Sequence, residues 1–197
     1  PNWKMGKKIS VDSATLMNKI FEVIEAKKIF DIELNKFDIL IHPKSYVHAI
    51  VKLKNGLIKI IAHDTNMKIP ISNSIYIGDK ERNFIRSKKI NLKILNSLNL
   101  QKVNTKKFPV IRLLKKITKE NSLFDTVLVS INDELVSLFL KNKISFSDIS
   151  SKISLLINSS FFSKFKHQKP NYLAQIEKLN EFVRLKTRTL SVISKKK

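Results

Sequence analysis

Cysteine is absent from this chain of 197 residues. Without thiols the chain forms neither disulfide bridges nor thiolate metal sites, which excludes disulfide-stapled scaffolds and cysteine-based zinc modules. The absence also fits a protein kept in a reducing compartment. A cytoplasmic location is therefore the expectation.

Glycine and long apolar runs are also scarce. The three glycines, Gly6, Gly56 and Gly78, lie far apart, whereas a dinucleotide-binding loop needs several at one strand-to-helix turn. The chain therefore carries no nicotinamide-binding loop of its own. Apolar residues make up 43% of the chain, which is ample for a core, but no run approaches the roughly 20 residues that span a bilayer. No membrane partner is expected.

Acidic side chains are few, with 16 Asp and Glu against 38 Lys and Arg, so the formal net charge is +22. Such a charge taken alone favours nucleic acid or an anionic membrane surface as a partner. The lysines are scattered, however, and no zinc-finger, helix-turn-helix or RNA-recognition signature accompanies them. A basic nucleic-acid-binding module stays an alternative, which predicts salt-sensitive binding to mixed-sequence DNA. The preferred expectation is that nucleic acid is not a partner.

Apolar patterning predicts strands and helices in the first part of the chain. Asn55-Gly56, between two apolar runs, is typical of a tight hairpin turn, and Pro70 fits the first turn of a short helix that reaches Ile75. Asp12 or Ser13 is a plausible N-cap for the first long helix. The predicted elements are a strand at 9–11, a helix at 14–29, and strands at 37–41, 47–53 and 57–62.

From about residue 103 the apolar spacing is helical throughout. The expected helices cover 109–120, 123–141, 146–157 and 172–193, with a connector at 159–170. The fold class is therefore α+β: a partial α/β domain with a small mixed sheet at 1–76, a linker at 77–102 and a helical bundle at 103–197. Because the chain opens at Pro1 inside a motif-like stretch, we expect it to be the C-terminal part of a longer protein.

Polar residues gather near the start of the first long helix. Asn18 and Glu22 are four residues apart, and Lys19 and Glu22 are three apart, so these side chains share one helix face. Ser13 is expected at the helix N-terminus, where backbone N–H groups favour an anion. The group suits a phosphorylated polar substrate, with Glu22 as an oxygen ligand for Mg²⁺ or Mn²⁺. The alternative is an ordinary Lys19–Glu22 surface pair with Ser13 as a simple cap.

Other candidate residues flank this group in the sequence. His48 follows Ser45 by three residues, and histidine is the side chain type best suited to proton transfer near neutral pH. Trp3 and Met5, beside Gly6, are typical of a mobile flap over a ligand, or else Trp3 packs on the core.

The stretch from Pro1 to Thr15, followed by Asn18-Lys19 and Glu22, resembles 1-deoxy-D-xylulose 5-phosphate reductoisomerase. The resemblance continues over most of the chain and thins after residue 150. Further matching segments are Ile41-His42-Pro43-Lys44-Ser45 with His48, Met67, Pro70-Ile71, Phe108-Pro109 and the stretch 132–149.

The resemblance implies an enzyme of isoprenoid precursor biosynthesis that rearranges a sugar phosphate and reduces the product with NADPH. It implies a divalent metal (Mg²⁺, Mn²⁺ or Co²⁺) that polarises substrate oxygens, and a homodimer formed through the sheet with the Asn55-Gly56 hairpin. The implied residue roles are substrate binding by Ser13, Asn18, Lys19, Trp3 and Ser45, metal binding by Glu22, catalysis by Glu22, Lys19 and His48, and cofactor contacts from Met5, Gly6 and Met67.

The resemblance also implies what the chain lacks. The family's NADPH domain and two further metal carboxylates lie before the part that this chain resembles, so the chain alone is expected to be inactive. Ile20 stands where the family has glycine, and its branched side chain is expected to crowd a neighbour near the site. This departure leaves a non-catalytic remnant as a second alternative.

Overall fold

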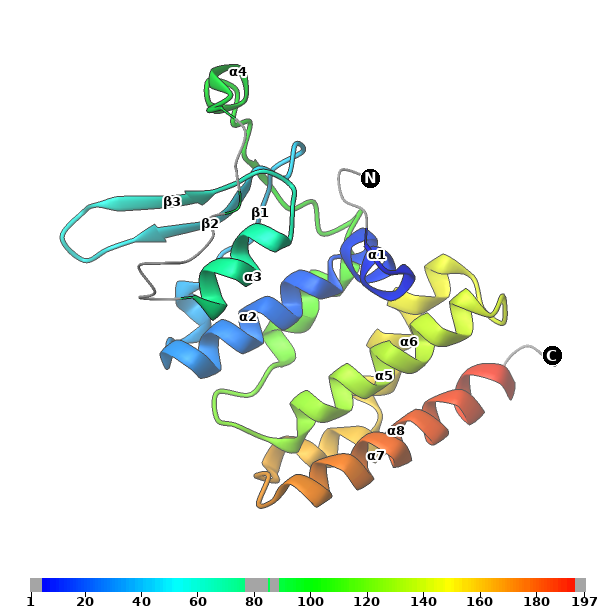
Figure 1. Ribbon diagram of the computed structural model, residues 1–197. Coiled ribbons are helices and arrows are strands. Elements are labelled where there is room, and N and C mark those ends of the chain that lie inside the picture. The colour runs from blue at the N-terminus through cyan, green and yellow to red at the C-terminus, as the bar shows by residue number, and fades with distance from the viewer. Residues whose placement is uncertain (1–4, 77–84, 86–88, 194–197) are drawn as a thin grey trace. The chain divides into compact units, whose positions relative to one another are not determined.

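The computed structural model describes residues 5–76, 85 and 89–193 (Figure 1). The chain divides into two compact units, and each is described by itself. The hairpin unit contains the described residues between 39 and 103, and the helical unit contains residues 5–38 together with 104–193. This division differs from the expected boundaries at 76 and 103, because the first two helices pack with the C-terminal helices.

The helical unit opens with two helices, α1 (Lys7–Thr15) and α2 (Met17–Phe30), and a short 3₁₀ turn, η1 (Leu34–Lys36). The predicted strand at 9–11 is wrong, since these residues lie in α1. Ile9-Ser10-Val11 alternates like a strand, but Val11 and Thr15, four residues apart, are buried together on one face of a helix. The predicted helix at 14–29 begins at Met17, because the backbone turns left-handed at Leu16.

The second half of the helical unit follows the predicted helical pattern closely. Its elements are η2 (Pro109–Lys116), α5 (Leu123–Leu140), α6 (Phe146–Asn158), α7 (Ser160–Ser163), η3 (Lys164–His167) and α8 (Leu173–Ile193). Segment 109–116 is a 3₁₀ helix rather than an α-helix, and the connector at 159–170 holds two short turns. Ser122 caps α5, and Ser145 with Asp148 forms a reciprocal capping box on α6.

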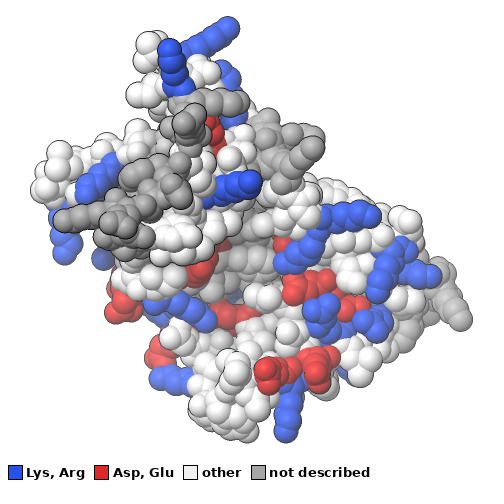
Figure 2. All heavy atoms as spheres, in the orientation of Figure 1, with Lys and Arg blue, Asp and Glu red and all other residues white. Residues whose placement is uncertain are grey.

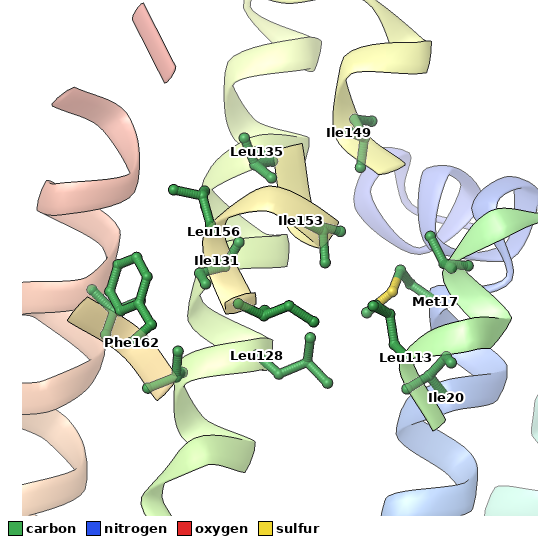
Figure 3. Packing of buried hydrophobic residues seen from close by; sticks show 14 of the residues in the cluster. Met17, Ile20, Leu113, Leu128, Ile131, Leu135, Ile149, Ile153, Leu156 and Phe162 are labelled. Carbon is green, nitrogen blue, oxygen red and sulfur yellow. The ribbon is translucent and has the colours of Figure 1, made fainter. Parts of the chain in front are cut away.

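The core of the helical unit gathers around α5, which packs against α8, α6 and α1. Met17 and Ile20 of α2 are fully buried and meet Leu113 and Leu128 in one continuous cluster (Figure 3). Ile20 therefore points into the core, not across the polar face that carries Asn18 and Glu22. Apolar side chains that recur every three to four residues are buried together along one helix face. This burial supplies most of the stability of such helices.

The hairpin unit confirms the Asn55-Gly56 turn. Strands β2 (Val47–Lys52) and β3 (Ile58–Ala62) pair antiparallel, with Ile50 opposite Ile60. Gly56 has φ +88°, a conformation that a residue with a side chain adopts only under strain. Asn55 Oδ1 accepts a hydrogen bond from the Leu57 backbone N–H at 3.1 Å.

The rest of the hairpin unit is built from short elements. Helix α3 (Lys68–Ile75) forms where Pro70 predicted one. The predicted buried strand at 37–41 is reduced to β1 (Leu40–Ile41), whose Leu40 is exposed. β1 pairs with β4 (Gln101–Lys102), which with α4 (Leu92–Leu95) lies in the segment expected to be a linker; most of 77–88 lies outside the described residues. Both sheets are antiparallel, so the α+β class is confirmed but the expected mixed sheet is not.

Candidate active site

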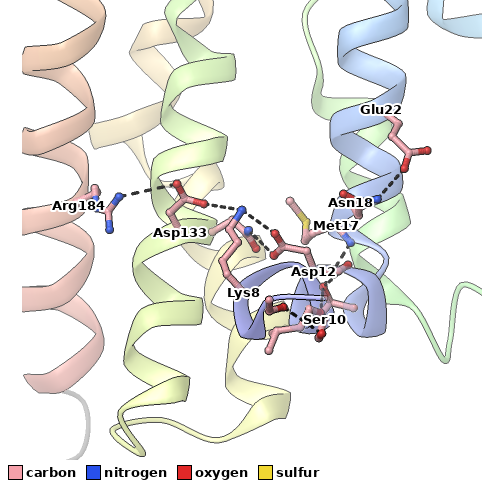
Figure 4. Close-up of polar contacts among 12 residues, drawn as sticks. Lys8, Ser10, Asp12, Met17, Asn18, Glu22, Asp133 and Arg184 are labelled. Carbon is pink, nitrogen blue, oxygen red and sulfur yellow. Dashed lines mark hydrogen bonds and ion pairs between the residues drawn. The ribbon is translucent and has the colours of Figure 1, made fainter. Parts of the chain in front are cut away.

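Asn18, Lys19 and Glu22 come together on the first two turns of α2, as their spacing predicted. The Asn18 amide Nδ2 donates to Glu22 Oε1 at 2.6 Å (Figure 4). Lys19 Nζ donates to Glu22 Oε2 at 2.7 Å. The Glu22 side chain is 45% exposed, so its carboxylate is reachable from solvent while two donors fix its orientation. This arrangement presents an ammonium, an amide and a carboxylate side by side.

The elbow between α1 and α2, residues 12–17, sets the direction of this polar face. Leu16 has φ 65° and ψ 13°, and its backbone N–H donates to Ser13 O at 3.2 Å. The Thr15 hydroxyl donates to Val11 O and accepts from Met17 N–H, which closes the turn with local hydrogen bonds. Because Met17 is fully buried, the next two side chains turn away from the core.

Ser13 is not where the sequence placed it. It lies in the last turn of α1, and neither Asp12 nor Ser13 is the N-cap of α2, which is Leu16. The prediction that Ser13 sits at a helix N-terminus is therefore wrong. The N-terminal end of α2, with its favourable field for anions, begins instead at Met17, beside Asn18 and Lys19.

A buried polar group behind the elbow was missed by the sequence reasoning. The Asn132 amide of α5 donates to Asp12 Oδ1 at 2.8 Å, and Lys8 Nζ lies 2.6 Å from Asp12 Oδ2 and 2.9 Å from Asp133 Oδ1 (Figure 4). Partial burial lowers the pKa of Lys8, but the hydrogen bonds to Asp12 and Asp133 outweigh it and raise that pKa above the ordinary 10.5. The four-residue spacing of Lys8 and Asp12 was a visible signal, but nothing in the sequence linked them to Asn132.

The other predicted residues lie in the first residues of the chain or in the hairpin unit. Met5 is half-buried, Gly6 is the N-cap of α1, and Trp3 lies outside the described residues. The remaining candidates, Ser45, His48 and Met67, belong to the hairpin unit.

Within the hairpin unit, His48 stacks on His63 with ring centroids 3.7 Å apart. Its Nε2 also lies 3.3 Å from His63 O. Ser45 has φ 51°, which places it in a turn before β2, and Met67 is half-exposed at the start of α3. The structure therefore shows where each residue lies in this unit without placing any of them at the α1–α2 elbow.

The described residues do not form a complete metal site. No group of three or more His, Cys, Asp or Glu side chains suited to one ion occurs within 5–76, 85 and 89–193. Glu22 supplies one hard oxygen ligand, whereas a magnesium site uses several oxygens in octahedral geometry. The polar residues at the start of α2 thus supply one metal ligand, the Glu22 carboxylate, and not a complete coordination sphere.

On the face shown in Figure 2, Lys and Arg side chains are spread over many elements and interrupted by Asp and Glu. Among the helices that the structure describes, none combines the length and the apolar character needed to cross a bilayer.

Family models match both parts of the chain. Residues 63–186 match the DXP reductoisomerase C-terminal domain, and residues 1–30 match the 1-deoxy-D-xylulose 5-phosphate reductoisomerase C-terminal domain. The matched segments include the start of α2 and most of the helical bundle.

Individual relatives agree with the family models. The 1-deoxy-D-xylulose 5-phosphate reductoisomerase of Pelagibacter ubique (strain HTCC1062) is 54% identical over 192 residues, covering 98% of this chain and 49% of the relative.

Solved structures carry the same likeness. A DOX-P reductoisomerase crystallised with NADPH, fosmidomycin and magnesium aligns over 100% of this chain and 48% of its own, with TM-score 0.87 and 27% identity. The Zymomonas mobilis enzyme in complex with NADPH aligns over 93% and 47%, with TM-score 0.80 and 28% identity. The chain spans about half the length of the relatives that it matches.

Proposed function

The chain belongs to the 1-deoxy-D-xylulose 5-phosphate reductoisomerase C-terminal domain family, and we propose on that basis that it serves the reaction of that enzyme. The reaction is the metal-dependent rearrangement and NADPH-dependent reduction of 1-deoxy-D-xylulose 5-phosphate to 2-C-methyl-D-erythritol 4-phosphate, an early step of isoprenoid precursor synthesis. The observation that carries the proposal is the Asn18–Lys19–Glu22 group on α2, inside a segment that matches the family.

Lys19 and Asn18 bind the substrate in this proposal. The ammonium attracts the phosphate, the amide of Asn18 hydrogen-bonds to phosphate or hydroxyl oxygens, and the N-terminal end of α2 adds a field of the right sign. Ser13 contributes its hydroxyl from the last turn of α1. Asn18 and Lys19 now donate to the Glu22 carboxylate and would donate to substrate oxygens instead when substrate binds. Because this frees the carboxylate for the metal, substrate binding and metal binding are linked through Glu22.

Glu22 is proposed as one ligand of the divalent metal, Mg²⁺, Mn²⁺ or Co²⁺. Its exposed carboxylate suits a hard cation, and the further ligands are proposed to lie in the part of the parent enzyme that this chain does not cover. When bound, the metal supplies Lewis-acid polarisation of substrate oxygens. The chain's own part is to hold the Glu22 carboxylate and to neutralise the phosphate with Lys19.

The remaining roles rest on the family relationship. Met5, Gly6 and Met67 are proposed to approach NADPH, with Trp3 and Met5 on a flap over the substrate. Ser45 and His48 are proposed to support the pocket, with His48 as a proton carrier.

We propose a homodimer formed through the β2–β3 sheet. Ile50, Ile58 and Ile60 are exposed on one face of this sheet, an apolar surface that a second copy would cover. We further propose a cytoplasmic enzyme without nucleic-acid or membrane partners, because the basic side chains are dispersed rather than gathered into one patch on the face shown (Figure 2).

The test uses the chain in two forms. The purified chain, mixed with the sugar phosphate, NADPH and Mg²⁺, is expected not to oxidise NADPH, because one carboxylate does not hold a catalytic metal. The same chain joined to the portion of the Pelagibacter ubique relative that it does not cover is expected to turn over. Turnover by the chain alone, or inactivity of a well-folded joined protein, would contradict the proposal.

A further inference from the structure

The α1–α2 elbow holds a conformation that its sequence disfavours. Leu16 is left-handed, with φ 65°, although leucine carries a side chain that clashes with the backbone there. Such a residue persists where the surrounding structure over-determines it. The hydrogen bonds of Thr15 are local and would follow the elbow if it moved, so the restraint must come from a different element.

The Asp12–Asn132 pair joins the elbow to a different element. Asp12 is 2% exposed and Asn132 is fully buried, and their side chains join α1 to α5 across 120 residues of sequence at 2.8 Å. A buried carboxylate is costly unless it is paired, so the position of Asp12 is fixed by the two donors that satisfy it. Those donors are Asn132 and Lys8.

Lys8 also contacts the two helices next to α1, namely α5 and α2. Its ammonium lies between Asp12 and Asp133, and 5.4 Å from the centre of the Phe21 ring on α2. Arg184 of α8 approaches Asp133 at 3.8 Å and Glu134 at 3.5 Å. Charges of alternating sign thus run from α1 through α5 to α8, on the side of the elbow away from the exposed Glu22.

We propose that Asp12 and Asn132 are positioning residues: their bond holds the left-handed elbow at Leu16 and thereby fixes where Asn18 and Lys19 present their donors. Neither residue touches the substrate. The identity of the ligand rests on the proposed function, but the positioning of the elbow does not. Leu16 precedes Asn18 by two residues, so a change in the φ and ψ of Leu16 reorients the start of α2.

The test follows inorganic phosphate binding to the isotope-labelled 197-residue chain by the amide shifts of Asn18 and Lys19. Asn132→Leu keeps the approximate volume and removes the donor. We expect it to weaken phosphate binding by about tenfold, equivalent to the loss of one hydrogen bond to a charged group. We also expect the ligand-free Cα and amide shifts of Leu16 to leave the left-handed range.

Two further variants separate positioning from general stability. Leu135→Ala creates a cavity elsewhere on α5 and is expected to lower stability without changing phosphate affinity. Leu16→Asn introduces a residue that tolerates the left-handed region, and in the Asn132→Leu background it is expected to restore most of the affinity. Restoration is a result that a merely structural role for Asn132 does not produce.

The outcomes are distinct. Unchanged Leu16 shifts in Asn132→Leu, equal phosphate affinity in that variant, or an equal loss in Leu135→Ala would each overturn the positioning role. If phosphate causes no shift at Asn18 and Lys19 even in the unaltered chain, the proposed function loses its support. In that case the Leu16 shifts alone still decide whether the Asp12–Asn132 bond holds the elbow.

Discussion

The start of α2 and the β2–β3 hairpin are built in opposite ways. Behind Asn18 and Glu22 the helix is anchored by the fully buried Met17 and Ile20, and Asp12 is tied to α5. The hairpin has a well-defined turn and register, but its isoleucines stay exposed on its strands. The helical unit thus contains its own support, whereas the apolar side chains of the hairpin strands are left uncovered in the described structure.

The largest expected effect is a difference in the stability cost of the same substitution at the start of α2 and on the β2–β3 hairpin. Ile20→Ala is expected to lower the free energy of unfolding by about 2–5 kcal/mol, because it leaves a cavity in a closed core. The matched change on the hairpin, Ile60→Ala, removes a side chain that is 50% exposed and is expected to cost under about 0.5 kcal/mol in the monomer. Urea unfolding of dilute samples measures both, and similar costs would break the comparison.

The second prediction concerns association through the hairpin. Ile60→Lys is expected to raise the dimer dissociation constant more than about tenfold, because a covered lysine without a partner is strongly unfavourable. Analytical ultracentrifugation over a concentration series measures the change. Leu155→Lys, at an exposed position of α6, is the control and should leave association unaltered. Equal behaviour of the two variants would remove the hairpin as the dimer surface.

The third prediction tests the turn that fixes the hairpin register. Gly56→Ala places a side chain at φ +88° and is expected to cost about 1–2 kcal/mol. Hydrogen exchange of the β2 and β3 amides should accelerate, while exchange in α5 should not. Acceleration throughout the chain would show that the two units do not open separately.

The smallest effect is a pH dependence in the helical unit. The pKa of Lys8 is raised in the folded chain, so its contribution to stability is fully present below its unfolded value of 10.5 and is lost as pH rises through the folded pKa. The stability difference between the unaltered chain and Lys8→Met is therefore expected to shrink above about pH 10.5. Because Lys8 is partly exposed, the effect is expected to stay below about 1 kcal/mol. A difference that stays constant to pH 12 would contradict the pairing.

The sequence predicted those features that depend on residues close together in the chain. Asn55-Gly56 determines a tight turn by its backbone preferences, and the spacing of Asn18 and Glu22 determines a shared helix face. The long C-terminal helices could be predicted from the spacing of apolar residues alone, because residues three and four positions apart form the one helix face that is buried.

The failures were non-local or ambiguous. The segment Ile9-Ser10-Val11 is too short for its pattern to distinguish a strand from a helix. In the structure it is helical, and Val11 is buried in the same core cluster as the apolar residues of α5. The left-handed Leu16 has no sequence signature, since that position usually calls for glycine. The Asp12–Asn132 bond crosses 120 positions, so no pattern within one segment predicts it.

The most direct test changes the Glu22 carboxylate at the start of α2, in the chain joined to the complementary portion of its Pelagibacter ubique relative. Glu22→Gln is expected to abolish Mg²⁺-dependent NADPH oxidation with the sugar phosphate, while Glu25→Gln, which removes the same charge less than one turn along the same helix, is expected to keep it. Near-normal turnover by Glu22→Gln would contradict the account, because the Asn18–Lys19–Glu22 group would then lie outside the active site.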